Sequence, residues 1–426
     1  MKYQSTAKER ISLSLTVYHG GFCMVKEVRR IGVQEEIDEI CFTDIARGIE
    51  AGSVLAKGFN MLEQRSSQDL LNKSNLLEKY IGQEVAIRKH DTGEERKIRL
   101  LSIGDGLIGE LQDTKEVVID PKGELVVPPL PESFFDGPAL VWKTAPGKME
   151  DHIKVSYLAE GIEWQMNYIA EIKGTELQLM GWLEIRNDAG IDFIGAALKL
   201  MAGKVYRQPR TGDFSPELGV HESSVSRPSI EGYDFRDRHT YRIGQPVTLL
   251  NGQTTQIAFL EAHIDSFRTI YEVDKWSNRA TIKMEFDNKK TNGLGVSLAS
   301  GKVKLYSLDT DKELEFIGED AIGSVTEGEA VSIRIGEAFN IRCNSYEKKR
   351  WMQEGVEYIT YCYDLANGKE ENVRIHIHHS MDEPIWTMES SSHDYEIRNA
   401  GNIMFIVRTA AKKEVPVEFT YRVDKR

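Results

Sequence analysis

The feature that most constrains this chain is the alternation of apolar and polar residues along most of its length. ISLSLTVY (11–18) alternates, a Gly20-Gly21 pair follows, and FCMVKEVRRIGV (22–33) continues the pattern. Successive side chains of a β-strand point to opposite faces, so this period predicts strands with one buried face. We therefore expect a mainly β protein with several β-sandwich-like domains. The Asn367-Gly368 pair between two alternating segments predicts a tight hairpin.

The charge balance limits the classes of partner. The chain has 426 residues, with 54 Lys and Arg against 67 Asp and Glu, which gives a net charge of -13. Proteins that follow a nucleic-acid backbone need an excess of basic residues, so no nucleic-acid partner is expected. A hydrophobic content of 40% is typical of chains that form packed cores.

The cysteines and the first residues indicate the compartment. Cys23, Cys41, Cys343 and Cys362 form no CxxC pair, which is typical of free thiols in a reducing environment. The N-terminal residues alternate in polarity and lack the continuous apolar segment of a signal peptide. No run of 18 apolar residues occurs, so no membrane span is expected. These observations predict a cytoplasmic protein.

The segment 70–131 differs from its surroundings. LLNKSNLLEKY (70–80) has the apolar spacing of a short helix, and about five short strands with glycine turns follow it. This pattern resembles the Sm-like small barrel, which implies an inserted β-barrel. Between 76 and 131 there are 11 acidic and 8 basic residues, a net charge of -3. That balance favours a structural or protein-contact module over an RNA-binding one.

The remaining sequence divides into three parts. We expect 1–69 and 132–203 to form one β-sandwich domain around the inserted barrel. The stretch 204–246 is polar and rich in Pro, Gly and Ser, which predicts a long loop that is either mobile or ordered only by a partner over 207–243. Alternation returns at 247, so 247–426 predicts one or two further sandwich domains.

Four ordered blocks carry a family resemblance: YLAEGIEWQMNYIAEI (157–172), the stretches 181–205 and 293–329, and IGEAFNIRC (335–343). Together they resemble the mucoidy-inhibitor-A-like family, whose C-terminal part is known as a domain of unknown function. The resemblance spans about 140–424 and implies sandwich-like β domains, but no catalytic residues. Members often carry a secretion signal and a coiled-coil insert, whereas this sequence shows no signal pattern and has the small barrel at 76–131 in the comparable place.

Three histidines in VRIHIHH (373–379) are candidate binding residues. On a strand His376 and His378 point to one face, while His379 falls on the apolar face. Two histidines at this spacing can bind zinc only with further ligands, and Asp382, Glu383 and His393 cannot be positioned from sequence. A polar strand face is the favoured interpretation, so no metal and no cofactor is predicted.

Two further groups have a functional and a structural interpretation. Trp164 and Tyr168, with Tyr157 and Trp182, are typical either of a sugar-binding face or of a sandwich core, and the core is favoured. SLDTDKELEFIGED (307–320) has acidic residues spaced as in a calcium loop, but Leu314 stands where such a loop requires glycine. A polar hairpin tip is the favoured interpretation of this stretch.

No known catalytic motif occurs, including the P-loop, GxGxxG, HExxH and GxSxG patterns, so no catalytic residue is nominated. We expect a binding or scaffold protein with a protein partner, or a homo-oligomer that assembles through strand edges. The alternative is a hydrolase that acts on a glycan or peptide at a site between domains.

Overall fold

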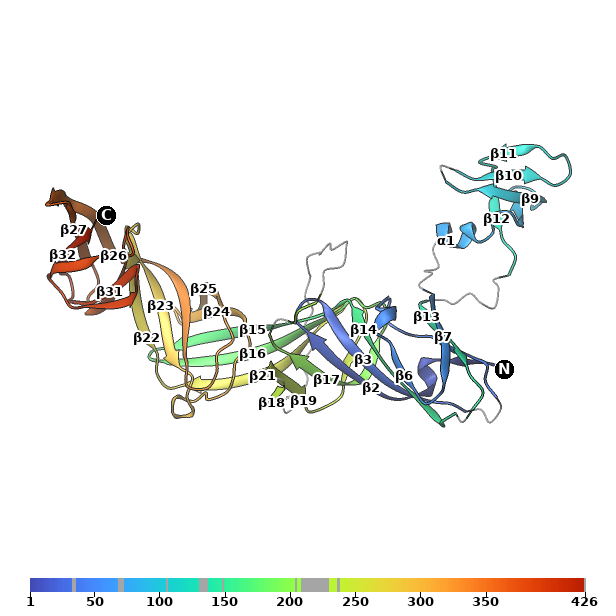
Figure 1. Cartoon of the computed structure of the whole chain (residues 1–426), viewed down its shortest axis with the longest axis horizontal. Helices are drawn as coiled ribbons and strands as arrows, with labels where there is room; N and C mark the ends of the chain where they lie inside the picture. Colours follow the sequence, from blue (N-terminus) through green and yellow to red (C-terminus); the bar gives the residue numbers. More distant parts are fainter. Residues whose placement is uncertain are drawn as a thin grey trace. The chain divides into compact units, whose positions relative to one another are not determined.

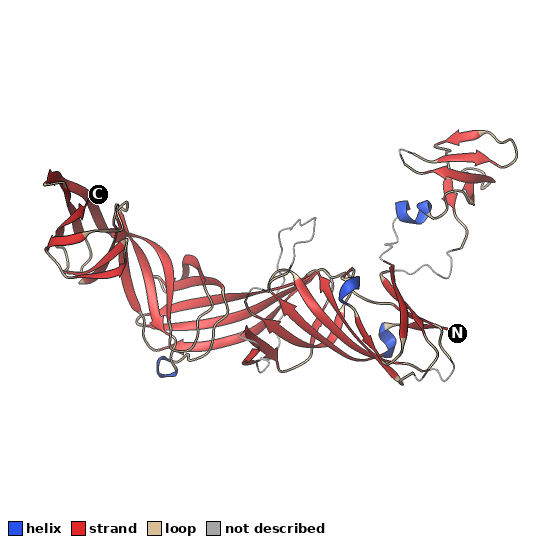
Figure 2. Ribbon diagram, viewed as in Figure 1, coloured by secondary structure: helices blue, strands red, loops and turns tan. Residues whose placement is uncertain are grey.

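The computed structural model confirms a mainly β protein with several multi-stranded sheets (Figures 1 and 2). It describes residues 1–32, 36–67, 73–104, 106–129, 137–147, 149–203, 205–207, 230–235 and 238–424. Helical structure in this part is confined to short segments: α1 (Lys73–Glu78) and three 3-10 turns, η1 (Ala7–Glu9), η2 (Ala51–Ser53) and η3 (Lys290–Asn292). No helix in the described ranges is long and apolar enough to cross a membrane.

The chain forms two compact units, which we call the first and second units. The first comprises Met1–Trp164, Ile185–His221 and Tyr233–Thr255, and the second comprises Gln165–Glu184, Glu222–Gly232 and Gln256–Arg426. The sequence assigns 132–203 as a whole to the first domain, whereas the structure places 165–184 in the second unit. The difference arises because the alternation in 157–187 runs through both unit boundaries without a turn signal there.

A four-stranded and a nine-stranded sheet form most of the first unit. The smaller one is ordered β1 (Lys2–Ser5), β4 (Glu39–Phe42), β13 (Ala139–Thr144) and β7 (Met61–Ser67). The larger one is ordered β18 (Ile230–Phe235), β19 (Arg238–Ile243), β17 (Phe193–Met201), β2 (Arg10–Tyr18), β3 (Phe22–Arg30), β14 (His152–Glu160) and β5 (Gly48–Ile49), with β20 (Val247–Leu249) beside β17 and β6 (Leu55–Lys57) beside β14. The outer strands of the larger sheet come from distant parts of the chain.

Strands β18 and β19 lie within 204–246, where the sequence predicts a loop, so that prediction is wrong for these two elements. Pairing with β17 gives the β19 backbone its hydrogen-bond partners and buries Tyr241 and Ile243. Residues 208–229, the centre of the predicted partner-ordered segment, lie outside the described part of the chain.

The segment after α1 forms a five-stranded sheet of its own, which we call the small sheet. Its order is β11 (Val117–Ile119), β10 (Ile108–Leu111), β9 (Glu95–Ser102), β8 (Glu84–Arg88) and β12 (Glu124–Val126). One helix followed by five strands confirms the predicted element order. Leu77 and Tyr80 pack into its core, and the Tyr80 hydroxyl donates to the Pro128 carbonyl at 2.9 Å. This bond ties the start of the insertion to its end.

The second unit contains a five-stranded and a nine-stranded sheet. The five-stranded one is ordered β21 (Gln253–Ile264), β16 (Glu176–Asn187), β15 (Ile162–Lys173), β24 (Gly301–Leu308) and β25 (Leu314–Ile322). The C-terminal sheet is ordered β29 (Thr387–Ser391), β32 (Glu414–Asp424), β27 (Val356–Asn367), β26 (Ala330–Gln353), β23 (Arg279–Asp287), β22 (Arg268–Asp274), β28 (Val373–Ser380), β31 (Asn402–Thr409) and β30 (Tyr395–Asn399). Its core is aromatic and aliphatic and includes Tyr363, Phe405, Phe419 and Tyr421.

Three buried asparagines, Asn187, Asn288 and Asn367, hold loops to distant strands in the same way. The Oδ1 atom of each accepts a backbone N–H at 3.0 Å, from Ala189, Gly295 and Lys369 respectively. The Nδ2 atom of each donates to two backbone carbonyls at 2.8–3.0 Å: Ile191 and Leu249, Val296 and Thr326, and Glu371 and Ala410. All of these backbone groups except that of Leu249 lie outside the strands, so the asparagine amides supply partners that strand pairing does not.

Replacing Asn367 by alanine should lower the free energy of unfolding by about 1–3 kcal/mol, because buried backbone groups lose their partners. Urea denaturation followed by circular dichroism measures this change. Asn344→Ala is the control, because Asn344 is exposed on β26, and it should change stability by less than about 0.5 kcal/mol. Equal effects of the two substitutions would contradict a special role for the Asn367 amide.

Candidate functional site

The predicted histidine pair lies on the outer face of the C-terminal sheet. His376 and His378 both point away from the core on β28, and both are half-buried rather than freely solvated. They are partly covered because β22 runs parallel to β28 and places Glu272 beside His376. On the other side, β31 is antiparallel to β28 and places Arg408 directly opposite Arg374. We call the surface formed by Glu272, Arg374, His376, His378 and Arg408 the histidine face.

Glu272 contacts two basic side chains on or beside the histidine face, Lys283 and His378. Its carboxylate lies 2.5 Å from Lys283 Nζ and 3.5 Å from His378 Nε2. Burial raises the pKa of Glu272, but the neighbouring His378 and Lys283 side chains outweigh it and lower the pKa to about 2. Burial lowers the pKa of His376, and the charge of Arg374 adds to the effect. At neutral pH the face therefore carries a charged carboxylate beside a neutral His376.

Three shallow depressions mark the histidine face. The first, of about 390 Å³, is lined by Arg268, Ile270, Glu272, Glu285, Arg374, His376, His378, Arg398 and Met404. The second, of about 400 Å³, shares Glu272 and His378 with it and extends toward Lys283 and Arg334. The third, of about 360 Å³, is lined by Asn372, Val373, Arg374, Arg408, Thr409 and Ala410. Arginines outnumber carboxylates in the first and third depressions.

The other metal-ligand candidates do not join the histidine pair. Asp382 binds Lys275 Nζ at 2.6 Å, and His393 Nδ1 lies 2.9 Å from the Ser392 hydroxyl. In the described residues, no three His, Cys, Asp or Glu side chains are placed to hold a metal ion together. Glu383 is exposed in the loop that follows β28.

His379 has the position that the alternation predicts, on the buried side of β28. Its ring is fully buried among Tyr361, Tyr363, Phe419 and Tyr421, and its Nδ1 lies 2.8 Å from the Tyr363 hydroxyl. Burial lowers the pKa of His379 to about 3, and the nearby charge of Lys275 also lowers it. This histidine is a neutral core residue at physiological pH.

The predicted aromatic candidates are core residues in two different units. In the first unit, the Trp164 ring is 4% exposed and stacks on His19, with a centroid separation of 4.2 Å. In the second unit, Tyr168 is 1% exposed, and its hydroxyl donates to the Ala299 carbonyl at 2.8 Å. Neither ring offers a face to a sugar, so packing explains both residues.

The acidic stretch after β24 is a hairpin tip, as the sequence predicts. β24 and β25 pair antiparallel up to Leu308 and Leu314. Within the turn, Asp309 accepts the Thr310 N–H at 2.7 Å and Asp311 accepts the Glu313 N–H at 2.9 Å. These two carboxylates stabilise the turn itself.

All four cysteines are buried and unpaired. Burial raises the pKa of Cys23 and of Cys343 to about 12. Their thiols therefore stay protonated at neutral pH, which makes them packing residues and not nucleophiles.

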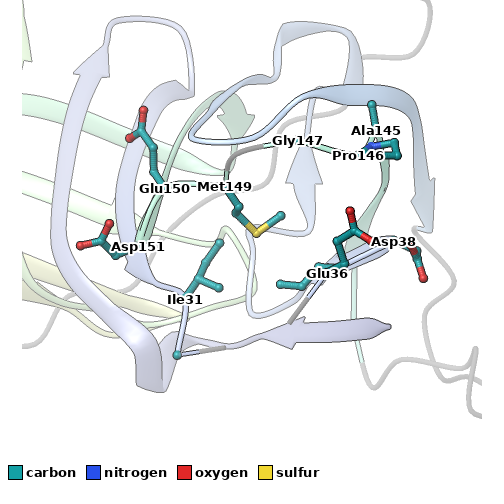
Figure 3. A pocket seen from close by; sticks show the side chains of 11 residues that line it. Ile31, Glu36, Asp38, Ala145, Pro146, Gly147, Met149, Glu150 and Asp151 are labelled. Atoms are coloured by element: carbon teal, nitrogen blue, oxygen red, sulfur yellow. The ribbon is translucent and has the colours of Figure 1, made fainter. Parts of the chain in front are cut away.

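A depression of about 580 Å³ in the first unit is lined by Ile31, Gly32, Glu36, Ile37, Asp38, Ala145, Pro146, Gly147, Met149, Glu150 and Asp151. In Figure 3, Glu150 and Asp151 lie on one side of Met149, and Glu36 and Asp38 on the other. Asp38 already binds the N-terminal ammonium group at 2.5 Å. The carboxylates give this depression an acidic surface.

The sequence did not single out the exposed apolar edge of the small sheet. β11 is an outer strand of this sheet, and its Val117 and Ile119 side chains are 58% and 70% exposed. Val118, between them, packs against the core of the small sheet. The three consecutive β-branched residues in EVVIDP predict a strand, but they do not show that this strand lies at the edge of its sheet.

No known family model matches the chain, and no curated protein matches it significantly.

Proposed function

We propose that this protein is a binding scaffold that self-associates through the open edges of its small sheet. The observation that carries the proposal is the exposure of Val117 and Ile119 on β11. An outer strand presents unpaired backbone N–H and C=O groups, and exposed apolar side chains add a hydrophobic contact for a second chain. Both features favour strand addition by a partner.

The composition of β11 contrasts with the outer strands of the C-terminal sheet. β29 and β30 contain charged residues, Glu389 in the first and Glu396 and Arg398 in the second. Charges on an edge strand oppose pairing with another chain. β11 consists of three apolar residues and has no such protection.

The fitting partner for β11 is β12 of a second copy. β12 is the other outer strand of the small sheet, and its Leu125 packs on the same core as Val118. A β12 strand placed beside β11 would continue that core on one face and bring Val126 toward Val117 on the other. The resemblance to Sm-like barrels supports this mode, since that class often closes rings by edge pairing between copies.

Two further parts of the proposal rest on the sequence. We place the scaffold in the cytoplasm, a reducing compartment, because four unpaired cysteines are typical of one. We also propose kinship with the mucoidy-inhibitor-A-like family, on the ordered blocks between 157 and 343. The mainly β fold agrees with what that resemblance implies.

Light scattering at tens of micromolar tests the self-association. The wild-type chain should exceed the 48.3 kDa of one copy, and nuclease should not change its mass. A Val117→Lys/Ile119→Lys variant should return to the monomer mass, because two lysines on an edge strand repel a second strand. Ile194→Lys is the matched control, since Ile194 is 56% exposed on β17, which has a neighbour on each side. A monomeric wild type, or an oligomer that survives the double substitution, would rule the proposed edge out.

A further inference from the structure

Two arginines face each other on the histidine face without a counter-ion. Arg374 on β28 is the register partner of Arg408 on β31, and both side chains are exposed. In the described part of the chain, neither guanidinium has a hydrogen bond or a carboxylate partner. Like charges directly opposite each other on neighbouring strands destabilise a sheet. This pair occurs in a protein whose net charge is -13, where carboxylates are plentiful.

The other cations around the histidine face are all paired. Lys283 binds Glu272 at 2.5 Å, Arg268 binds Glu285 at 2.6 Å, Arg398 binds Glu396 at 2.9 Å, and Arg334 binds Asp320 at 3.2 Å. The positive charge of Arg374 and Arg408 is therefore uncompensated locally. An anion held between these two guanidinium groups would remove their mutual repulsion.

The surface beside the two arginines has room for a ligand larger than a simple ion. Both arginines line the depression of about 360 Å³, and Arg374 also lines the neighbouring one of about 390 Å³. The depression of about 390 Å³ has an apolar component in Ile270 and Met404, which are 7% and 3% exposed. An apolar group in it would lie beside His376 and His378.

We propose that Arg374 and Arg408 bind the phosphate group of a small organic phosphate, whose apolar part lies over Ile270 and Met404. A guanidinium presents two parallel N–H groups to an oxyanion. A phosphate monoester has three terminal oxygens and up to two negative charges, so it can accept from both arginines at once. A carboxylate has two oxygens and one charge, and it would leave one of the arginines uncompensated.

Titration calorimetry with phenyl phosphate, inorganic phosphate and benzoate tests the site. Phenyl phosphate should bind saturably with one molecule per chain, more tightly than inorganic phosphate and much more tightly than benzoate. Arg374→Gln and Arg408→Gln should each weaken phenyl phosphate binding by about tenfold or more, because each removes charge-assisted hydrogen bonds.

Arg334→Gln is the matched control, since Arg334 lies on β26 of the same sheet and is paired with Asp320. It should leave phenyl phosphate affinity unchanged. In phosphate-free buffer, Arg408→Gln should unfold at a temperature no lower than the wild type, because the substitution removes a repulsion. Non-saturable heats, equal losses in the Arg334→Gln variant, or benzoate binding as tight as that of phenyl phosphate would each overturn the proposal.

Discussion

Replacing Arg29 by methionine should lower the stability of the first unit by about 3–5 kcal/mol, because it breaks a fully buried ion pair. Arg29 and Glu27 are 0% and 1% exposed on β3, and an Arg29 amino group lies 2.7 Å from the Glu27 carboxylate. The same guanidinium donates to the Ser5 and Thr43 carbonyls at 3.0 and 2.8 Å and lies 3.6 Å from the centre of the Phe42 ring. Methionine fills the space but removes the guanidinium donors, so the Thr43 carbonyl loses its Arg29 partner, while the Glu27 carboxylate and the Ser5 carbonyl each lose one of several.

Arg30→Met provides the control for this change. Arg30 is the next residue of β3 and is exposed, so its replacement should alter stability by less than about 0.5 kcal/mol. Urea denaturation of both variants, followed by tryptophan fluorescence, gives the comparison, and Trp142 and Trp164 contribute the signal of the first unit. Glu27 keeps Arg10 as a partner at 2.9 Å in the Arg29→Met variant. A loss below about 1 kcal/mol would mean that Arg10 alone compensates the buried carboxylate.

Acidification from pH 7 to pH 4.5 should destabilise the second unit by about 3 kcal/mol through His379 alone. Burial lowers the pKa of His379 from 6.5 to about 3 in the folded protein, with a further contribution from Lys275. Between these values the unfolded chain binds a proton that the folded chain does not. Stability is therefore unaffected above pH 6.5 and falls by about 1.4 kcal/mol per pH unit down to about pH 3.

The contribution of His379 is isolated by comparing pH profiles. His379→Gln preserves an acceptor for the Tyr363 hydroxyl and has no proton to gain, so its unfolding free energy should depend less on pH between 4.5 and 6.5. Some slope should remain, since burial also lowers the pKa of His376 and of His19. His90→Gln, at an exposed position of the small sheet segment, is the control. An unchanged profile in His379→Gln would show that this ring is not the acid-sensitive group.

Local patterns in the sequence were sufficient to predict several of the elements. Alternation in VRIHIHH places His376 and His378 on one face and His379 in the core, and the structure agrees. The helix, glycine turns and short strands of 70–131 likewise predict the small sheet. Its strands β8, β9 and β10 each pair with the next strand along the chain, and β12 pairs with the first strand, β8. Where pairing is local, the sequence contains most of the information that decides it.

The Asn367-Gly368 pair shows why a short sequence motif can fail to predict which strands pair. It predicts a tight hairpin, but β27 pairs with β26 and β32, whereas β28 pairs with β22 and β31. A two-residue turn of the favoured type needs positive φ at both central residues, and neither Asn367 nor Gly368 has it. The Asn367 amide instead bonds to distant carbonyls, and those contacts are invisible in a short window of sequence.

The candidate site depends on strand register, which the sequence does not determine. Nothing in VRIHIHH indicates that Arg374 lies opposite Arg408, or that Glu272 lies beside His376. These neighbours come from strands that are far apart in the chain. A one-residue shift of β31 would move Arg408 into the core, so the register is fixed only by the packing of the folded sheet.

The parallel pairing of β2 with β17 has a consequence for synthesis on the ribosome. Ser14 of β2 pairs with Ala197 of β17, so one side of β2 has no partner until most of the first unit has emerged. During that interval the nascent chain exposes a long alternating strand edge, which favours contact with other nascent chains and with chaperones. The small sheet has no such delay, because its five strands are contiguous, and it can fold as soon as β12 has left the exit tunnel.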